Sequence, residues 1–178
     1  MNEHDQATEF ARAFSEGRLV LPQFDDEMWQ LCARVNLVCV VSPDLDYPPM
    51  DGQGIEAFLV GAFADSEDES AVRGLHLRDA FREFAGETKF GWLNEIVPPE
   101  LKLPNGEVAT MLYSMETEPR RGEAIPPEVW IQPETIRDWD FHPYICEGLV
   151  AVKIVLCDSR QRRISETFDW PTFKRENC

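Results

Sequence analysis

The chain has 178 residues and a formal net charge of −16, spread unevenly: residues 1–118 carry a net −15 and residues 119–178 a net −1. This charge disfavours direct binding of nucleic acid, because phosphate contacts need clustered lysine and arginine side chains. Eleven phenylalanines and five tryptophans exclude an acidic disordered tail, which has few aromatic residues. No run approaches the roughly 20 apolar residues of a membrane span, and the polar first ten residues lack a secretory signal pattern. We therefore expect a cytoplasmic protein without membrane contact.

Five cysteines stand at wide spacings, and none of them forms a Cys-x-x-Cys pair. A disulfide framework is denser than this, and a structural zinc site normally shows a close pair. We therefore expect neither, and we expect Cys32, Cys39 and Cys157 to be small buried side chains.

Two amphipathic helices are predicted within the first 36 residues. Gly17 suits the end of the first, and the acidic residues 25–27 suit the start of the second, where the helix dipole favours negative charge. Asn36 is the predicted end of the second helix. Apolar residues recur in both at i, i+3, i+4 and i+7, which makes one helical face: Ala7, Phe10, Ala11 and Phe14, then Met28, Leu31, Cys32 and Val35.

The character of the sequence changes after Asn36. The run LVCVVS from Leu37 is rich in β-branched residues and IEAFLVGAFA from Ile55 is apolar, so both are predicted as strands. Turn residues and charges make SPDLDYPPMDGQG and DSEDES predicted loops. A third helical stripe follows and is ended by Gly86; it consists of Leu77, Ala80, Phe81 and Phe84.

Two nine-residue segments, EIVPPELKL from Glu95 and EAIPPEVWI from Glu123, share one pattern. Proline lacks an N–H and biases the preceding residue toward extended geometry. Each segment is therefore predicted to be a stiff lead-in to a strand that begins there or lies at a sheet edge. The sequences diverge beyond these nine residues. We therefore interpret the pattern as the same local entry into a strand at two places in the chain rather than as a structural repeat.

Two hairpins are predicted in the last 80 residues. Asn105-Gly106 is a strong two-residue turn signal between LKL and VATMLYSM, and DSRQR separates GLVAVKIVLC from RISETFDW. The strand GLVAVKIVLC is apolar on both faces, which predicts an interior position in a sheet. The basic cluster Arg160, Arg162 and Arg163 is predicted to be solvated at the second hairpin tip.

These elements predict a single globular domain over residues 1–178, helix-rich in 1–36, mixed in 37–97 and β-rich in 98–178. The expected fold class is α+β, with about three amphipathic helices packed on a mainly antiparallel sheet of five to seven strands.

The segment DWDFH holds the pattern of a metal site. If residues 138–142 are extended, Asp138, Asp140 and His142 face one side and two aromatic residues face the other. Two carboxylates and an imidazole suit Mn²⁺, Fe²⁺ or Zn²⁺. A divalent metal at these residues is the one cofactor that the sequence raises, and a metal-dependent enzyme built on it is one hypothesis. The competing interpretation is a half-buried strand with a polar outer face.

Catalytic motifs with a defined spacing are absent: no Gly-x-Ser-x-Gly, no His-Glu-x-x-His, no phosphate-binding glycine loop and no dinucleotide-binding glycine fingerprint. The leading hypothesis is therefore a non-catalytic acidic protein that binds a basic surface of a partner protein, as an inhibitor or immunity protein does, including one that mimics nucleic acid. A small-molecule binding domain with a pocket at Trp92, Trp130 or Trp139 is the further alternative. The candidate partner-binding residues are Asp44, Asp46, Asp51, Asp65, Glu67, Asp68 and Glu69.

Overall fold

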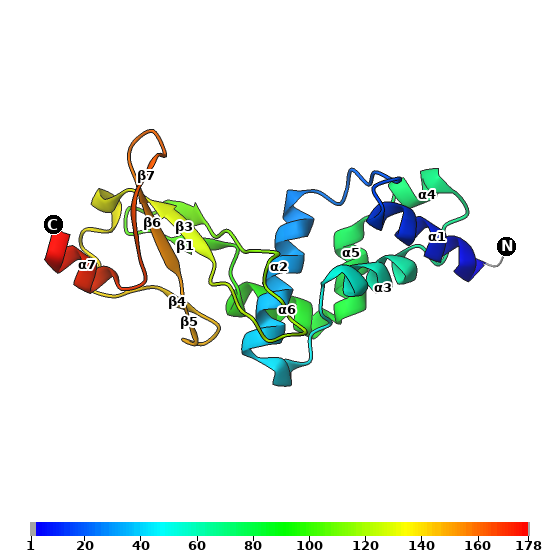
Figure 1. The fold of residues 1–178 in the computed structure, drawn as a ribbon, viewed down its shortest axis with the longest axis horizontal. Helices are drawn as coiled ribbons and strands as arrows, with labels where there is room; N and C mark the ends of the chain where they lie inside the picture. Colours follow the sequence, from blue (N-terminus) through cyan, green and yellow to red (C-terminus); the bar gives the residue numbers. More distant parts are fainter. Residues whose placement is uncertain (1–2, 178) are drawn as a thin grey trace.

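The computed structural model describes residues 3–177, which fold into an elongated molecule with two ends of different character (Figure 1). Helices α1, α3, α4 and α5 form one end, the strands and α7 form the other, and α2 and α6 lie between them. We call residues 3–97 the helical part and residues 98–177 the β part.

The three predicted amphipathic helices are present as α1, the first half of α2, and α5, but the predicted number of about three helices is too low, because residues 3–177 hold seven α-helices. Asp25 caps α2, because its carboxylate accepts a hydrogen bond from the Met28 N–H at 3.0 Å. Gly86 ends α5 with a φ of +94°, a backbone conformation that favours glycine. The elements are α1 (Glu3–Ser15), α2 (Asp26–Val41), the 3-10 helix η1 (Pro43–Leu45), α3 (Gly52–Ala62), α4 (Glu69–Arg73), α5 (Leu77–Ala85) and α6 (Glu87–Ile96).

The prediction of two strands between residues 37 and 64 is wrong. Residues 37–41 continue α2, and most of the run from Ile55 forms α3. All eight α2 residues from Leu31 to Val38 are buried, so this helix is enclosed on every face at its centre. A short apolar run of this kind has no polar stripe to reveal its period, and periodicity alone does not separate a buried helix from a buried strand.

The loop between α2 and α3 is fixed by two close backbone contacts. Asn36, predicted to end its helix, instead lies inside it: its Oδ1 accepts from the Met50 N–H at 2.7 Å and its Nδ2 donates to the Met50 carbonyl at 3.1 Å. A Cβ at Gly54 would lie 1.7 Å from the Pro49 carbonyl oxygen. Glycine at this position therefore lets the loop pass directly against the start of α3.

The β part holds three small sheets instead of the predicted single sheet of five to seven strands. Strands β1 and β2 pair antiparallel, β4 and β5 pair antiparallel, and the third sheet has the order β3-β6-β7 with β3 and β6 parallel. The α+β class is confirmed. The elements are β1 (Glu100–Lys102), β2 (Val108–Thr110), β3 (Glu128–Ile131), the 3-10 helix η2 (Pro133–Ile136), β4 (Tyr144–Ile145), β5 (Val150–Ala151), β6 (Lys153–Cys157), β7 (Arg163–Thr167) and α7 (Trp170–Asn177).

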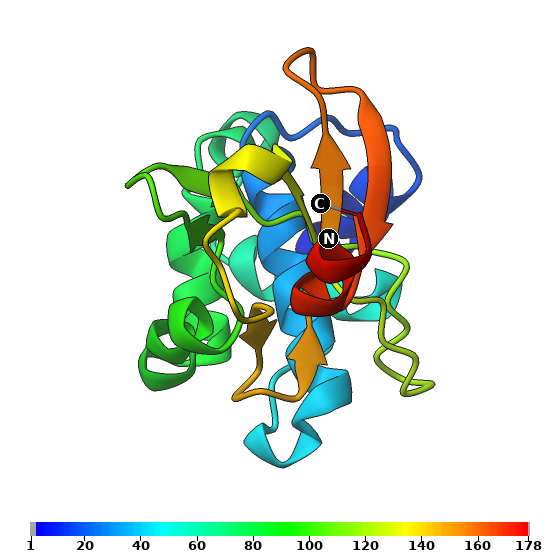
Figure 2. The same cartoon turned by 90° about the vertical axis from the view of Figure 1, so that its left-hand side faces the viewer.

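Local signals in the β part are confirmed. Both predicted hairpins form, as β1–β2 and β6–β7, and each proline pair directly precedes a strand at a sheet edge, β1 or β3. The central strand β6 is buried from Ile154 to Cys157, as its two apolar faces predict. In Figure 2, which looks onto the C-terminal end, α7 lies in front of the long β6–β7 hairpin.

The two parts are joined by polar contacts around α2. Arg34, only 6% exposed, acts within the helical part: it donates from Nε to the Val97 carbonyl and from a terminal nitrogen to Asn94 Oδ1, both at 2.7 Å, and so holds α2 to the end of α6. The Gln30 amide exchanges two hydrogen bonds with the Tyr113 backbone, at 2.8 and 3.0 Å. One cluster of buried apolar side chains runs from Ala7 in α1 to Trp170 in α7. Within residues 3–177, no helix has the length and hydrophobicity that crossing a bilayer requires.

Candidate functional site

The structure does not bring together the three proposed metal ligands. Residues 138–142 form a turn and irregular chain instead of the predicted strand, so their side chains do not share a face. The Asp140 carboxylate accepts from Lys174 Nζ at 3.1 Å, and Asp138 is exposed on the turn. Among the residues that the structure describes, no group of three His, Cys, Asp or Glu side chains is arranged to hold a metal ion.

His142 has a structural role that explains why it lies apart. Its Nδ1 accepts from the Trp170 N–H at 3.1 Å, so Nε2 carries the proton and donates to the Val152 carbonyl at 2.7 Å. Both ring nitrogens are thus occupied by backbone groups. Burial lowers the pKa of His142, because it disfavours the charged ring.

The acidic residues of the first loop mainly shape the loop itself. Asp51 caps α3, with its carboxylate accepting from the Gly54 N–H at 2.9 Å, and it pairs with Arg120. Partial burial raises the pKa of Asp51, but the Arg120 guanidinium and the Gly54 N–H outweigh this and lower it. Asp46 adopts a left-handed conformation at the end of η1 and lies 3.9 Å from Lys89 Nζ, whereas Asp44 is exposed.

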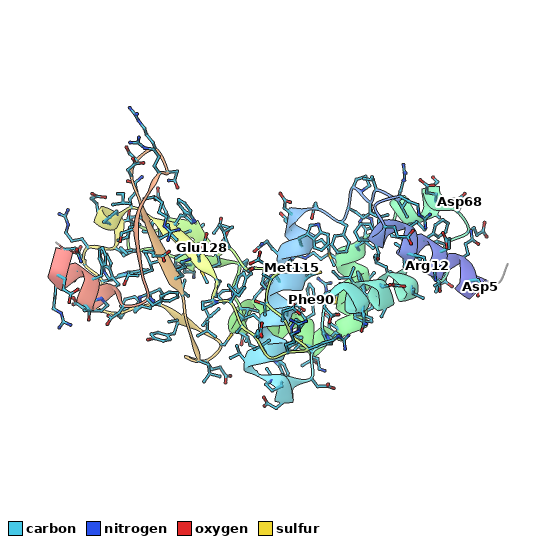
Figure 3. The ribbon with its side chains drawn as sticks, viewed as in Figure 1. Asp5, Arg12, Asp68, Phe90, Met115 and Glu128 are labelled. Carbon is cyan, nitrogen blue, oxygen red and sulfur yellow. The ribbon has the colours of Figure 1, made fainter. Side chains whose placement is uncertain are left out.

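The second acidic loop lies at the far end of the helical part, the end at which Figure 3 labels both Asp68 and Asp5. Asp68 caps α4 by accepting from the Ala71 N–H at 2.8 Å, and Glu69 pairs with Arg73. Gln6 of α1 donates to the Glu67 carbonyl at 2.7 Å and thereby holds the loop against α1. The carboxylates of Asp65 and Glu67 form no ion pair within residues 3–177.

Asp65 belongs to a hollow of about 510 Å³ between α3 and α5. Its lining includes Phe84, a residue of the predicted apolar stripe that is 40% exposed and packs against Phe58 with ring centroids 5.4 Å apart. Glu83 also belongs to the lining and likewise has no ion-pair partner in the described chain. The hollow is lined by Phe58, Gly61, Ala62, Asp65, Leu75, His76, Ala80, Glu83 and Phe84.

This hollow combines apolar area with unpaired negative charge. Lysine and arginine bury their aliphatic stems on apolar surface while their charged heads reach a polar group. The lining therefore offers a basic side chain both apolar surface for its stem and carboxylates, Asp65 and Glu83, for its head. Sequence reasoning identified Asp65 but missed Glu83 and His76, because they are brought to the hollow only by the helical packing of α3 on α5.

The three tryptophans proposed for a ligand pocket lie in three different settings. Trp139 is buried and Trp92 is exposed on α6, so neither contributes to a shared pocket. Trp130 is half-buried on β3 and lines a larger groove in the β part. Its indole Nε1 donates to the Glu128 carboxylate at 3.0 Å.

Of the three cysteines predicted to be buried, Cys32 and Cys157 are buried and Cys39 is half-buried; Cys146 is buried as well. Burial raises the pKa of Cys32 to about 12 and that of Cys39 and Cys146 to about 11. These groups are therefore protonated at neutral pH, and the thiolate is the nucleophilic form.

Comparison with known proteins reveals a shared fold and no sequence family. No family model and no curated protein matches the sequence. The fold resembles part of HrpB. The crystal structure of the Escherichia coli DExH-box NTPase HrpB matches with a TM-score of 0.71 and 20% identity, over 84% of this chain and 18% of that chain. The structure of the E. coli DEAH/RHA helicase HrpB matches with a TM-score of 0.70 and 18% identity, over 92% and 20%. The chain thus spans about a fifth of the HrpB chains, and the likeness concerns the fold alone.

Proposed function

We propose that the protein is a non-catalytic interaction module whose helical part binds a basic segment of a partner protein in the hollow between α3 and α5. The observation that carries the proposal is the pair of unpaired carboxylates, Asp65 and Glu83, in a lining that also contains apolar side chains. The surrounding charge favours the same kind of ligand, because residues 1–97 contain 19 acidic and 7 basic side chains, a net −12.

Electrostatic complementarity gives this interaction its expected character. Opposite potentials accelerate encounter and orient the partner, while apolar contact contributes most of the affinity. Rim charges are screened by salt, with a Debye length near 10 Å at 0.1 M. Binding is therefore expected to weaken between 50 and 300 mM salt without being abolished.

The likeness to HrpB raises one rival ligand. The matched structures are those of an NTPase and helicase, of whose length this chain covers about a fifth. A helicase acts on nucleic acid, so nucleic acid is the rival. The net charge of −16 opposes it, and two arginines of the one basic cluster are already paired: Arg162 with Asp158 and Arg163 with Glu166.

The test compares charge loss inside and outside the hollow. The double variant Asp65→Asn/Glu83→Gln removes both carboxylates, and Asp26→Asn/Glu95→Gln removes two exposed carboxylates elsewhere with the same change in net charge. The probe is a fluorescent 12-residue peptide that alternates lysine and leucine, titrated by polarisation. The first variant is expected to bind about five- to tenfold more weakly, from two exposed ion pairs, and the control within about twofold of wild type.

The same variants then serve in pull-downs from an extract of the native cells. A physiological partner should be retained at low salt by wild type and control and lost with Asp65→Asn/Glu83→Gln. Equal loss in both double variants would contradict a local site, and so would tighter binding of a 12-nucleotide single strand than of the peptide.

A further inference from the structure

The β part contains a groove along two strands that are joined at a single bridge. Leu112, just beyond β2, and Glu128, the first residue of β3, exchange both backbone hydrogen bonds at 2.8 and 3.0 Å. Glu128, labelled in Figure 3, marks this bridge, beyond which the two strands belong to different sheets. The groove has a volume of about 820 Å³, within the range of roughly 300–1,000 Å³ that small-molecule sites occupy.

Side chains from one face of both strands line the groove. Residues directly opposite each other in an antiparallel bridge share a face, and alternate residues of each strand continue that face. Leu112, Thr110 and Val108 therefore lie on the same face as Trp130, and all four line the groove. Leu112 and Val108 are 41% and 52% exposed, so this face presents apolar surface to a ligand.

Trp130 adds a flat apolar surface whose orientation is fixed. Its Nε1 donates to the Glu128 carboxylate at 3.0 Å, and that carboxylate lies 3.6 Å from Lys153 Nζ. The indole N–H is thus satisfied within the protein, while the half-buried side chain still lines the groove. The ring is therefore available for contact with an apolar face of a ligand rather than for a hydrogen bond to it.

Neutral hydrogen-bonding groups surround this apolar surface. Gln132 and Thr135 lie next to each other, because the Thr135 N–H donates to the Gln132 carbonyl at 3.0 Å. Their side chains form no hydrogen bond within residues 3–177, and neither does the hydroxyl of Thr110. Primary amides and hydroxyls both donate and accept, so these groups suit a ligand that carries neighbouring hydroxyls.

The charge of the lining disfavours an ionic ligand. Among the described residues that line the groove, Glu107 is the one charged side chain, and its carboxylate already accepts from Asn105 Nδ2 at 2.8 Å. A phosphate or carboxylate entering the groove would lose water without gaining a basic side chain from the lining, which is costly. The lining therefore suits an uncharged ligand.

We propose that this groove binds a neutral sugar, with one face of the sugar ring stacked on Trp130 and its hydroxyls hydrogen-bonded to Gln132 and Thr135. A sugar ring combines the two properties that the lining requires, because its C–H groups form an apolar face while its hydroxyls donate and accept. Aromatic side chains supply large contact areas for such a face. The site lies in the β part and shares no lining residue with the hollow between α3 and α5.

The first test compares ligands that differ in one property each. The probes are glucose, galactose, mannose and N-acetylglucosamine, with sorbitol as a polyol that has no ring face and glucuronate as a sugar that carries a carboxylate. The indole N–H signals of isotope-labelled protein report binding, and Trp130→Phe assigns the signal of Trp130. At least one neutral sugar should shift this signal with a Kd on the order of 1 mM for a single ring. Sorbitol and glucuronate should bind at least about fivefold more weakly. Added salt should leave the affinity for the neutral sugar unchanged, because screening acts on charges.

The second test compares matched variants inside and outside the groove. Gln132→Ala should weaken sugar binding about threefold to tenfold, from the lost amide hydrogen bonds. Gln53→Ala makes the same change at an exposed residue of α3 and should leave the affinity unchanged. Trp130→Leu should weaken binding about tenfold or more, whereas Trp92→Leu, at a tryptophan 44% exposed on α6, should not weaken it.

Three results would overturn the proposal. The first is that none of the neutral sugars at about 50 mM shifts the Trp130 signal. The second is equal loss of binding in Gln132→Ala and Gln53→Ala. The third is that a single-stranded oligonucleotide or the lysine–leucine peptide shifts the Trp130 signal at lower concentration than any sugar, which would identify another occupant. Asp65→Asn/Glu83→Gln should leave sugar binding unchanged, so each of the two proposals fails separately.

Discussion

The helical part and the β part of this molecule offer different chemistry to a partner. Residues 1–97 hold 19 acidic and 7 basic side chains, whereas residues 98–178 hold 14 and 10. The helices satisfy their backbone groups internally, so the surface of this part consists mainly of side chains. The β part divides seven strands among three small sheets and leaves strand edges open. The comparison shows that the negative charge of the chain is concentrated in the helical part, where the proposed binding hollow lies.

The two parts nevertheless share one apolar cluster and a polar junction. Whether they unfold together decides the prediction of a single domain, and the following substitutions test this from the largest expected effect to the smallest.

Trp170→Ala is expected to cause the largest loss of stability. The side chain is fully buried, and its Nε1 donates to the Ile136 carbonyl at 3.0 Å. Its removal should cost about 4 kcal/mol, measured by urea unfolding, while Phe168→Ala, at a residue 47% exposed, should cost less than about 1 kcal/mol. If the parts are coupled, helix content and near-ultraviolet signal fall together. Helices that persist after the β part melts would show two domains.

Gly54→Ala probes the helical part in the same way. A Cβ placed 1.7 Å from the Pro49 carbonyl oxygen forces the backbone of the loop or of α3 to move, with an expected cost of about 3 kcal/mol. Gly52→Ala is the matched control in the same helix, because nothing lies within 4 Å of its Cβ, and it should stabilise by about 0.5 kcal/mol. Equal melting temperatures for the two variants would contradict the close approach.

Gln30→Met tests the junction. Methionine keeps the apolar stem but removes both hydrogen bonds with the Tyr113 backbone, at an expected cost of about 2 kcal/mol. Hydrogen exchange should then show faster opening of residues on both sides of the junction. Exchange that changes only within α2 would show that Gln30 does not couple the two parts.

The stability of the β part should depend on pH through His142. Burial lowers its pKa in the folded state, so below the ordinary value near 6.5 the unfolded chain binds the extra proton first. The contribution of His142 to the free energy of unfolding is therefore complete above pH 6.5. It is lost as the pH falls below 6.5, with a slope of at most about 1.4 kcal/mol per pH unit. His142→Gln should show a shallower loss of unfolding free energy between pH 7 and 5. An unchanged slope would assign the pH dependence to other groups.

Local patterns in the sequence predicted the elements whose faces differ in polarity. The stripe of α1 and the Asn105-Gly106 turn are examples, because each depends on neighbours in the chain. The prediction of a strand from Leu37 was wrong, because the rest of the protein encloses α2 and the helix therefore has no polar face to mark it. The alternation of polar and aromatic residues in DWDFH predicted a strand, and this prediction was wrong. Lys174 and Trp170 of α7, about 30 residues away, form hydrogen bonds that hold the segment as a turn.

The candidate site was predictable only in part, for the same reason. Asp65 stands out in an acidic run, but Glu83 joins it only once residues 55–62 are a helix that packs on α5. Phe84 belongs to the predicted apolar stripe of α5, although it is exposed at the hollow. The groove between β2 and β3 has no sequence signal, because it depends on which strands fail to pair.

The buried thiols allow local opening of each part of the molecule to be measured by its rate of chemical modification. Cys32 lies in α2 and Cys146 follows β4, and both are almost fully enclosed. An alkylating reagent reaches either sulfur only when the surrounding structure opens, so the rate of modification measures the frequency of opening at that point. Mass spectrometry of the two cysteine peptides from one timed reaction would therefore show whether α2 or the chain after β4 opens more often, without any engineered label.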